Sequence, residues 1–311
     1  MILHRGLFTV ASLALSLSGI SPAIACSMCK CGDPTFNALG TQVFVADKLR
    51  FTVDWARFEK TAAEQPESSP QSANAPRIGA QASDAVVNNG EEMRVTFGLA
   101  YSVKDRLTVM ASLPFAKHQL TGAGEALDSR GLADPEFTGV VRVWRDVSAV
   151  VGVKTAWGRD ELEAEGERLD QHLQPGTGST DWTLGGSIVH QTGNVTAVYG
   201  SLMHRFTGSN RLGYEYGNSW LANIGVQRRF NRRFSGSLEL NGRDAGQDRI
   251  NDADEIDANS GGRVAYVSPR LLVHLGHDVV ARAGLQVPVY ERLDGVQDEK
   301  VNFHVGLTAV F

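Results

Sequence analysis

The stretch EMRVTFGLAYSVKDRLTVMASLPFAKH, residues 92–118, decides the fold because apolar side chains recur at every second position along it. The apolar set is Met93, Val95, Phe97, Leu99, Tyr101 and Val103 before Lys104-Asp105, and Leu107, Val109, Ala111, Leu113 and Phe115 after it. A period of two puts each set on one face of a β-strand. Because only a short polar turn separates the two runs, they predict an antiparallel hairpin.

The same alternation continues to the carboxyl end of the chain. It recurs in segments 49–60, 135–145, 147–157, 181–191, 194–206, 218–230, 233–243, 262–275, 278–290 and 300–311. With the first hairpin this makes about twelve strands, each near the ~10 residues that cross a bilayer at a slant. An even number of such strands predicts a closed antiparallel barrel.

The connections between these strands alternate in length. Short ones lie at 104–105, 145–146, 192–194, 231–233 and 276–278, and long polar ones at 61–91, 119–134, 158–180, 207–217, 244–261 and 291–299. Outer-membrane barrels have short periplasmic turns and longer extracellular loops, whereas long structureless connections are uncommon in compact soluble domains. The sequence therefore predicts an all-β, closed antiparallel transmembrane barrel over residues 49–311, in the bacterial outer membrane.

Charged and polar side chains on the second face of each strand identify the interior of that barrel. The predicted lumen-lining residues are Arg50, Asp54, Arg94, Arg142, Lys154, Glu239, Arg243, Arg282 and His304, with Asn223, Gln227, Asn241 and Gln286 in the same phase. Facing lipid at mid-depth, each charge would cost roughly 2–4 kcal/mol. Cations outnumber anions in this set, which favours small anions or zwitterions. A lumen closed by its own salt bridges is the alternative.

The two ends of the chain carry targeting signals. Residues 1–25 have a basic start, a short apolar run and Ala23-Ile24-Ala25, which together are typical of a secretory signal peptide. The last strand, KVNFHVGLTAVF, ends on Phe311, and a carboxyl-terminal aromatic residue looks like the recognition signal read by the outer-membrane insertion machinery. We expect the lipid bilayer, that machinery and a small solute as partners.

Cys26, Cys29 and Cys31, the three cysteines of the chain, lie in the segment 26–48 that follows the predicted signal. This segment is expected in the periplasm, an oxidising compartment. Together with Met28, these sulfur atoms form a candidate site for Cu(I) or Zn²⁺. A disulfide between two of the cysteines and a lipidated Cys26 remain open alternatives.

A cluster of carboxylates stands out in the predicted outer loop 243–262. It consists of Asp244, Asp248, Asp252, Asp254, Glu255 and Asp257. The spacing does not match the calcium-binding loop of an EF-hand. We therefore expect a solvated acidic loop rather than a Ca²⁺ site.

Several function classes find no support in the sequence. The net charge of -5 and the lack of nucleic-acid-binding motifs argue against a nucleic-acid partner. No Gly-x-Ser-x-Gly or His-Glu-x-x-His motif occurs, so no enzyme is predicted. His190, His204, His274 and His304 lie on different predicted strands, which argues against a shared metal site among them.

Four stretches carry a family resemblance. They are DRLTVMASLPFAKH (105–118), GLADPEFTG (131–139), LQPGTGSTDWTLG (173–185) and SPRLLVHLGHDVVARAGLQVPVYERLDGVQ (268–297). Their strand ends and turns resemble those of bacterial outer-membrane β-barrel transporters related to phenol meta-pathway degradation proteins. Where many members have Gly-Leu-Gly-Asp, this chain has Gly131-Leu132-Ala133-Asp134.

The resemblance implies a barrel that transports a small solute, with the cysteine segment as a candidate metal link. The alternative function is a non-conducting barrel that acts as a scaffold or metal sensor and docks a periplasmic partner through residues 26–48.

Overall fold

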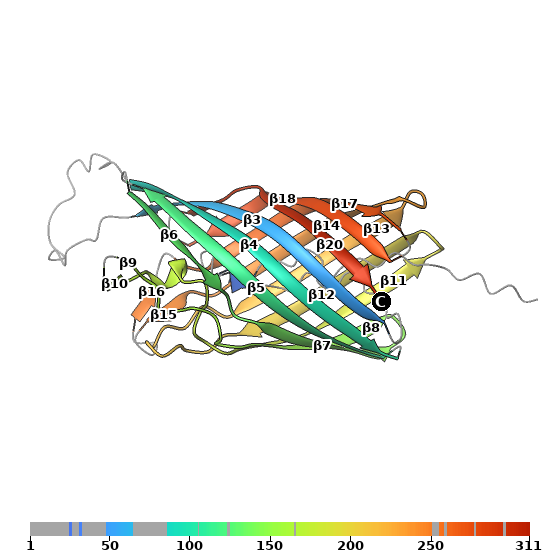
Figure 1. The fold of residues 1–311 in the computed structure, drawn as a ribbon, viewed down its shortest axis with the longest axis horizontal. Coiled ribbons are helices and arrows are strands. Elements are labelled where there is room, and N and C mark those ends of the chain that lie inside the picture. The colour runs from blue at the N-terminus through green and yellow to red at the C-terminus, as the bar shows by residue number, and fades with distance from the viewer. Residues whose placement is uncertain are drawn as a thin grey trace, which may run out of the picture.

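In the computed structural model the described residues are 25–26, 31–32, 48–64, 86–104, 106–122, 125–164, 166–250, 255–257, 260–276, 278–294 and 297–311. Twelve strands close into one antiparallel barrel (Figure 1). They are β3 (Leu49–Glu64), β4 (Val86–Val103), β5 (Leu107–Gly122), β7 (Glu136–Trp144), β8 (Val147–Lys154), β11 (Asp181–Thr192), β12 (Thr196–Phe206), β13 (Ser219–Arg229), β14 (Phe234–Ala245), β17 (Gly262–His274), β18 (Val279–Leu293) and β20 (Asn302–Val310). The predicted fold class is confirmed.

The barrel closes where its first and last strands meet. β3 pairs with β4 on one side and with β20 on the other, so that Asp54 lies opposite Gly306. The backbone N–H of Leu49 donates to the carbonyl of Phe311 at 3.2 Å, and the N–H of Phe311 donates back at 2.8 Å. Closure pairs the backbone N–H and C=O groups of the two edge strands. Lipid hydrocarbon could not supply hydrogen bonds to these groups.

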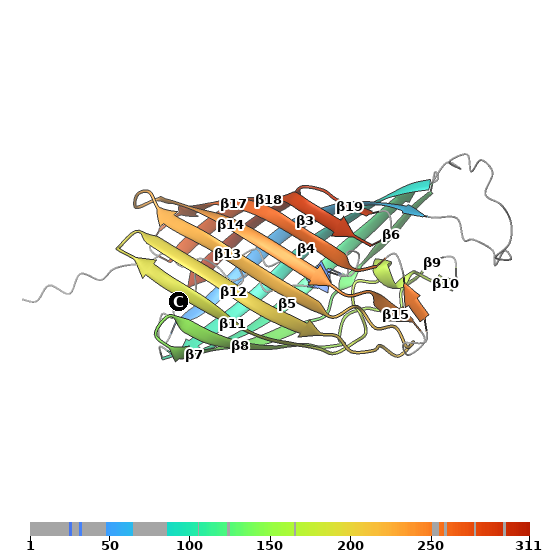
Figure 2. The ribbon, with the colours of Figure 1, turned by 180° about the vertical axis from the view of Figure 1, so that it is seen from behind.

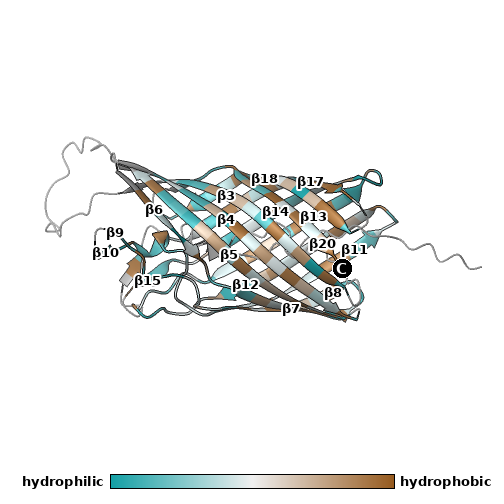
Figure 3. Ribbon diagram, viewed as in Figure 1, coloured by the Kyte–Doolittle hydropathy of each residue, from teal (hydrophilic) through white to brown (hydrophobic). Residues whose placement is uncertain are grey.

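The two faces of the wall differ in polarity, as the period-two pattern predicts. Along β13, Asn223 is 6% exposed whereas its neighbour Ile224 is 59% exposed. Apolar and polar residues alternate along the other strands too (Figure 3). The exposed apolar side chains of the wall face outward, opposite to the arrangement in small soluble barrels. The outer surface of the barrel therefore contacts the lipid bilayer.

Strands extend further on the long-loop side than the sequence predicts. β6 (Glu125–Leu132) pairs with β5 beyond the end of β7, and β19 (Gln297–Glu299) pairs with β3 beyond β20. The expectation that 119–134 and 291–299 are loops was therefore wrong in part. The β5–β6 extension carries polar residues on both faces, with Lys117 opposite Arg130 on one face and His118 opposite Ser129 on the other, so it shows no apolar alternation.

Short elements lie beyond the barrel strands at the end with the long connections. They are β9 (Glu163–Ala164), β10 (Glu167–Arg168), the 3-10 turn η1 (Gln171–Leu173), β15 (Asp248–Ile250) and β16 (Glu255–Asp257). The carboxyl terminus lies at the opposite end, and both views show this separation (Figures 1 and 2). Among the described residues, no helix is long and apolar enough to cross a membrane.

Two short strands are described near the amino end. β1 (Ala25–Cys26) pairs with β2 (Cys31–Gly32), with Cys26 opposite Cys31, and β2 contacts β13 and β14. Residues 1–24, and Met28 and Cys29 of the candidate sulfur site, lie outside the described residues. The predicted signal peptide and the predicted sulfur site therefore stay predictions.

Candidate channel lumen and outer cap

An ion-pair network fills the interior next to the closing seam. The carboxylate of Asp54 pairs with the guanidinium of Arg282 and lies 2.9 Å from Nε2 of His304. All three side chains are buried. Gly306 makes room for this contact, because a Cβ at that position would lie 2.1 Å from Oδ1 of Asp54. The lack of a side chain at Gly306, on the inward face of β20, therefore lets Asp54 occupy this position.

Two further buried networks repeat this design on other strands. Arg94 pairs with Glu92, and Arg270 lies 3.4 Å from Oε1 of Glu239. The same Glu239 oxygen accepts a 2.7 Å hydrogen bond from the hydroxyl of Tyr199. Such charges can be buried because each carboxylate lies beside an arginine and accepts a hydrogen bond.

A fourth network surrounds the ammonium group of Lys154. Its Nζ lies 2.9 Å from Asp181 and 3.3 Å from Asp134, and it also donates to the hydroxyl of Thr177. Asp134 accepts a 2.7 Å hydrogen bond from the backbone N–H of Thr177. Asp134 comes from the stretch GLADPEFTG, and Thr177 and Asp181 come from LQPGTGSTDWTLG. Two stretches that carry the family resemblance therefore meet at one buried lysine.

The described parts of segments 155–180, 207–218 and 246–261 pack together over the end of the barrel opposite the carboxyl terminus, and we call them the outer cap. The hydroxyl of Tyr216 donates to the carbonyl of Gln171 at 3.1 Å, which joins the first two segments. Reciprocal backbone hydrogen bonds between Glu215 and Arg249, of 2.9 and 2.8 Å, join the second to the third. Ser129 of β6 donates to the carbonyl of Leu173 and fixes the cap to the wall.

The cap crosses the carboxylate of Asp134 at two glycines. The backbone N–H of Gly158 donates to Asp134 at 2.8 Å, and a Cβ on Gly158 would lie 2.7 Å from the same oxygen. A Cβ on Gly176 would lie 2.7 Å from the carbonyl carbon of Gly158. The chain therefore passes Asp134 so closely that a side chain at either glycine needs the backbone to move.

Two small cavities lie between interior side chains of the described part of the barrel. One cavity of about 20 Å³ lies beside Arg50, Ser112 and Glu136, and another of about 10 Å³ lies beside Lys154 and Thr177. The first has about the volume that a single water molecule requires.

The structure places most of the predicted lumen residues on the buried, inward face. These are Arg50, Asp54, Arg94, Lys154, Glu239, Arg243, Arg282 and His304, together with Asn223, Gln227, Asn241 and Gln286. Arg142 is half-buried beside a register shift between Arg142 and Trp144 in β7.

Sequence reasoning missed five buried carboxylates that accompany these cations. They are Glu92, Asp134, Glu136, Asp181 and Glu299. Arg205 lies 3.4 Å from Glu136, and Arg243 lies 3.5 Å from Glu299. The interior charge is thus nearer to balance than the predicted cation excess. Asp134 and Glu299 lie in predicted loops, where no alternation marks them. Glu92, Glu136 and Asp181 share the inward phase of their predicted strands, and that phase could have identified them.

Arg50 differs from the other buried cations. Its side chain is 3% exposed, and neither terminal guanidinium nitrogen has a hydrogen-bond partner. It borders the 20 Å³ cavity together with Thr52 and Glu136. Burying a guanidinium costs free energy unless its nitrogens find hydrogen-bond partners, so among the described residues Arg50 is a candidate position for a ligand.

Comparisons with known proteins agree with this architecture. No family model matches the chain, and no curated protein matches it. The chain is similar to the COG4313 outer membrane channel from Pseudomonas putida F1, with 13% identity, 88% of this chain and 98% of the other covered, and a TM-score of 0.62. It is also similar to the translocator domain of autotransporter NalP from Neisseria meningitidis, with 10% identity, 84% and 88% covered, and a TM-score of 0.48.

A third similar structure is the P. putida toluene transporter TodX, with 12% identity, 94% of this chain and 97% of the other covered, and a TM-score of 0.43. The likeness to the COG4313 channel concerns the fold, and the predicted resemblance to outer-membrane barrel transporters is confirmed at that level. With its apolar outer face, the chain is a closed twelve-stranded β-barrel of the bacterial outer membrane.

Proposed function

We propose that the protein is a narrow outer-membrane channel for a small anionic or zwitterionic solute. The polar, charge-lined interior inside an apolar wall supports this proposal, since such a lining stabilises hydrophilic solutes in transit. The chain also shares its fold with a solved protein described as an outer membrane channel. The small interior cavities favour a solute of few atoms, and the ion-pair networks make passage selective.

Arg50 is the observation that carries the preference for anions. Its two terminal nitrogens lack hydrogen-bond partners, whereas Arg94, Arg205, Arg243, Arg270 and Arg282 each have a carboxylate neighbour. An anion next to Arg50 would supply charge-assisted hydrogen bonds to buried donors. In this proposal Arg50 is a binding position for the solute inside the barrel.

Single-channel recording of the purified protein in planar bilayers tests this function. We expect discrete conductance steps that are anion-selective, and we expect Arg50→Gln to shift the reversal potential toward cations. Because Arg50 has no ionic partner to lose, the variant should still fold. Arg263→Gln is the matched control, since Arg263 is exposed and pairs with Asp244 at 2.9 Å.

Two results would reject the proposal. A folded barrel that gives no conductance steps would favour the non-conducting scaffold, and an unchanged reversal potential in Arg50→Gln would remove Arg50 from the path.

We further propose that the outer-membrane insertion machinery recognises Phe311. Phe311 is exposed on the outer face and ends the strand that closes the barrel. Deleting it should slow assembly in cells while leaving refolding of the purified chain into detergent unchanged. Equal assembly of both chains in cells would contradict this role.

A further inference from the structure

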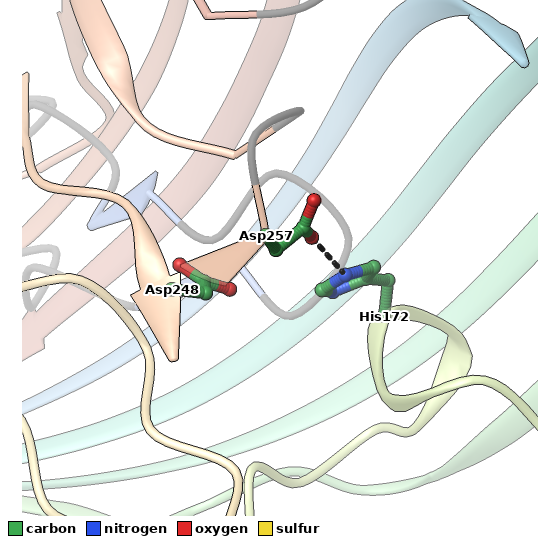
Figure 4. A group of neighbouring side chains, drawn as sticks. All are labelled: His172, Asp248 and Asp257. Carbon is green, nitrogen blue, oxygen red and sulfur yellow. Dashed lines mark ion pairs between the residues drawn. The ribbon is translucent and has the colours of Figure 1, made fainter. Parts of the chain in front are cut away.

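A histidine and two aspartates from distant parts of the sequence meet in the outer cap (Figure 4). His172 lies in η1, Asp248 in β15 and Asp257 in β16. One possible ligand atom of each lies within 4.8 Å of the others. The three residues belong to two cap segments, 155–180 and 246–261, so a common ligand would tie these segments together.

The two carboxylates face each other across a two-stranded ribbon. β15 and β16 are antiparallel, and their register places Asp248 directly opposite Asp257. Like charges in directly opposed positions destabilise a ribbon. Water screens this repulsion only in part, because Asp248 is 1% exposed and the side chain of Asp257 is 23% exposed. A cation between the two carboxylates would turn this repulsion into attraction.

Asp248 is held in position by groups around it. Tyr214 donates its hydroxyl hydrogen to Oδ2 of Asp248, and the backbone N–H of Gly217 donates to Oδ1 at 2.9 Å. The backbone N–H of Asp248 in turn donates to Ser260 Oγ at 2.7 Å. Hydrogen bonds of this kind orient carboxylates that bind metals.

The ring of His172 is fixed by aromatic packing and faces the carboxylates. It lies edge-on to Tyr214 and Tyr216, with centroid distances of 5.7 and 6.2 Å. Its Nε2 lies 3.8 Å from Oδ2 of Asp257 and 3.9 Å from Oδ1 of Asp170. Its Nδ1 is shielded from solvent and has no hydrogen-bond partner among the described residues. An imidazole so placed offers a nitrogen ligand that the acidic loop alone does not have.

The donor set identifies the class of ion. One imidazole nitrogen with two carboxylate oxygens suits borderline divalent transition metals such as Zn²⁺ or Co²⁺, whereas Ca²⁺ prefers sites made of oxygens only. Three protein ligands leave further coordination positions for water. We propose that His172, Asp248 and Asp257 bind one divalent transition-metal ion that ties together the segments of the outer cap.

Zinc titration of the full mature chain tests the site, using protein refolded into detergent without metal or lipopolysaccharide. Because the amino-terminal cysteines are themselves candidate zinc ligands, the titration uses a chain in which Cys26, Cys29 and Cys31 are replaced by serine. We expect one Zn²⁺ per chain by calorimetry, a higher melting temperature with Zn²⁺, and much weaker binding of Ca²⁺.

Matched variants separate this site from adventitious binding. His172→Ala, and Asp257→Asn as the milder change, should each weaken Zn²⁺ binding by at least about tenfold. His190→Ala is the control, because His190 also lies near a carboxylate, 2.8 Å from Asp146, but near a short turn of the barrel wall. This control should bind Zn²⁺ as the parent chain does. Circular dichroism checks that each variant is folded.

Three outcomes would overturn the proposal. They are no Zn²⁺ binding by the folded chain up to millimolar concentration, equal binding by the His172→Ala and Asp257→Asn variants, and Ca²⁺ binding as tight as Zn²⁺ binding that survives loss of His172. In the first case the cluster is held together by the contacts of its own side chains, such as the hydrogen bond from Tyr214 to Asp248. None of these outcomes bears on whether the barrel conducts, because the site lies outside the lumen networks.

Discussion

The lumen and the outer cap both bury carboxylates, but they balance the charge differently. In the lumen, Asp54 and Glu239 each face an arginine supplied by another strand. In the cap, Asp248 and Asp257 face each other, and the nearby basic group in Figure 4 is the imidazole of His172. An arginine thus supplies the positive charge beside each of these lumen carboxylates, whereas in the cap the proposed metal ion would supply it. Changes in the two regions should have different consequences.

The largest expected effect comes from breaking a lumen network. Asp54→Asn leaves the buried Arg282 without its counter-charge, which typically costs about 3–5 kcal/mol. Urea unfolding in detergent, followed by tryptophan fluorescence, measures the change. Asp298→Asn is the control, since its ion pair with Lys300 is long and exposed. Equal stability of the two variants would show that the lumen network does not stabilise the barrel.

A charge on the lipid face should have the next largest effect. Ile224→Arg places a guanidinium on the exposed face in the middle of β13, and roughly 2–4 kcal/mol of stability should be lost near the bilayer midplane. The same unfolding measurement in lipid vesicles checks it, with Ile224→Val as the control. A neutral result for Ile224→Arg would mean that this face does not contact hydrocarbon.

Crowding the cap should destabilise the protein less. Gly158→Ala puts a methyl group 2.7 Å from Asp134, and such overpacking costs about 1–3 kcal/mol. Gly276→Ala is matched to it, because a Cβ at Gly276 meets nothing within 4 Å. We expect a lower melting temperature for the first variant alone. If both variants melt alike, the close crossing at Asp134 is absent in solution.

The smallest effect is expected at the polar extension of the wall. Lys117 lies 3.5 Å from Asp128 and joins β5 to β6, and both side chains are well exposed. Exposed pairs contribute about 0–1 kcal/mol, so Lys117→Ala should change the unfolding midpoint little and less still at high salt. A loss as large as that of Asp54→Asn would remove the distinction between buried and exposed pairs.

The strands of the barrel wall could be predicted from the sequence because the alternation of apolar and polar residues can be seen within each strand alone. Every membrane-crossing strand shows a period of two, as in the run from Met93 to Val103, and the strand ends at the short turns agree closely with the predicted ones. The phase of that pattern also placed Asp54 and Arg282 on the inward face. Strands beyond the membrane, such as β6, have water on one or both sides, so their sequences do not alternate between apolar and polar residues.

The cap and the charge partners could not be predicted in the same way. Asp134, Lys154 and Thr177 are brought together by a loop that folds back over the barrel, and no periodicity marks such a contact. The loop carboxylates were visible in the sequence, but His172 is far from them along the chain. The candidate sites therefore depend on contacts between residues far apart in the sequence, whereas the wall depends on the alternation within each strand.

Spin labels placed one at a time along Ser219–Arg229 test the central claim most directly, since the account rests on an apolar outer face and a polar inner face of one closed wall. In lipid vesicles, the label should be accessible to oxygen dissolved in the bilayer at positions 220, 222, 224 and 226, and protected from it at 219, 221, 223 and 225. Accessibility without this alternation, or alternation in the opposite phase, would contradict the barrel described here.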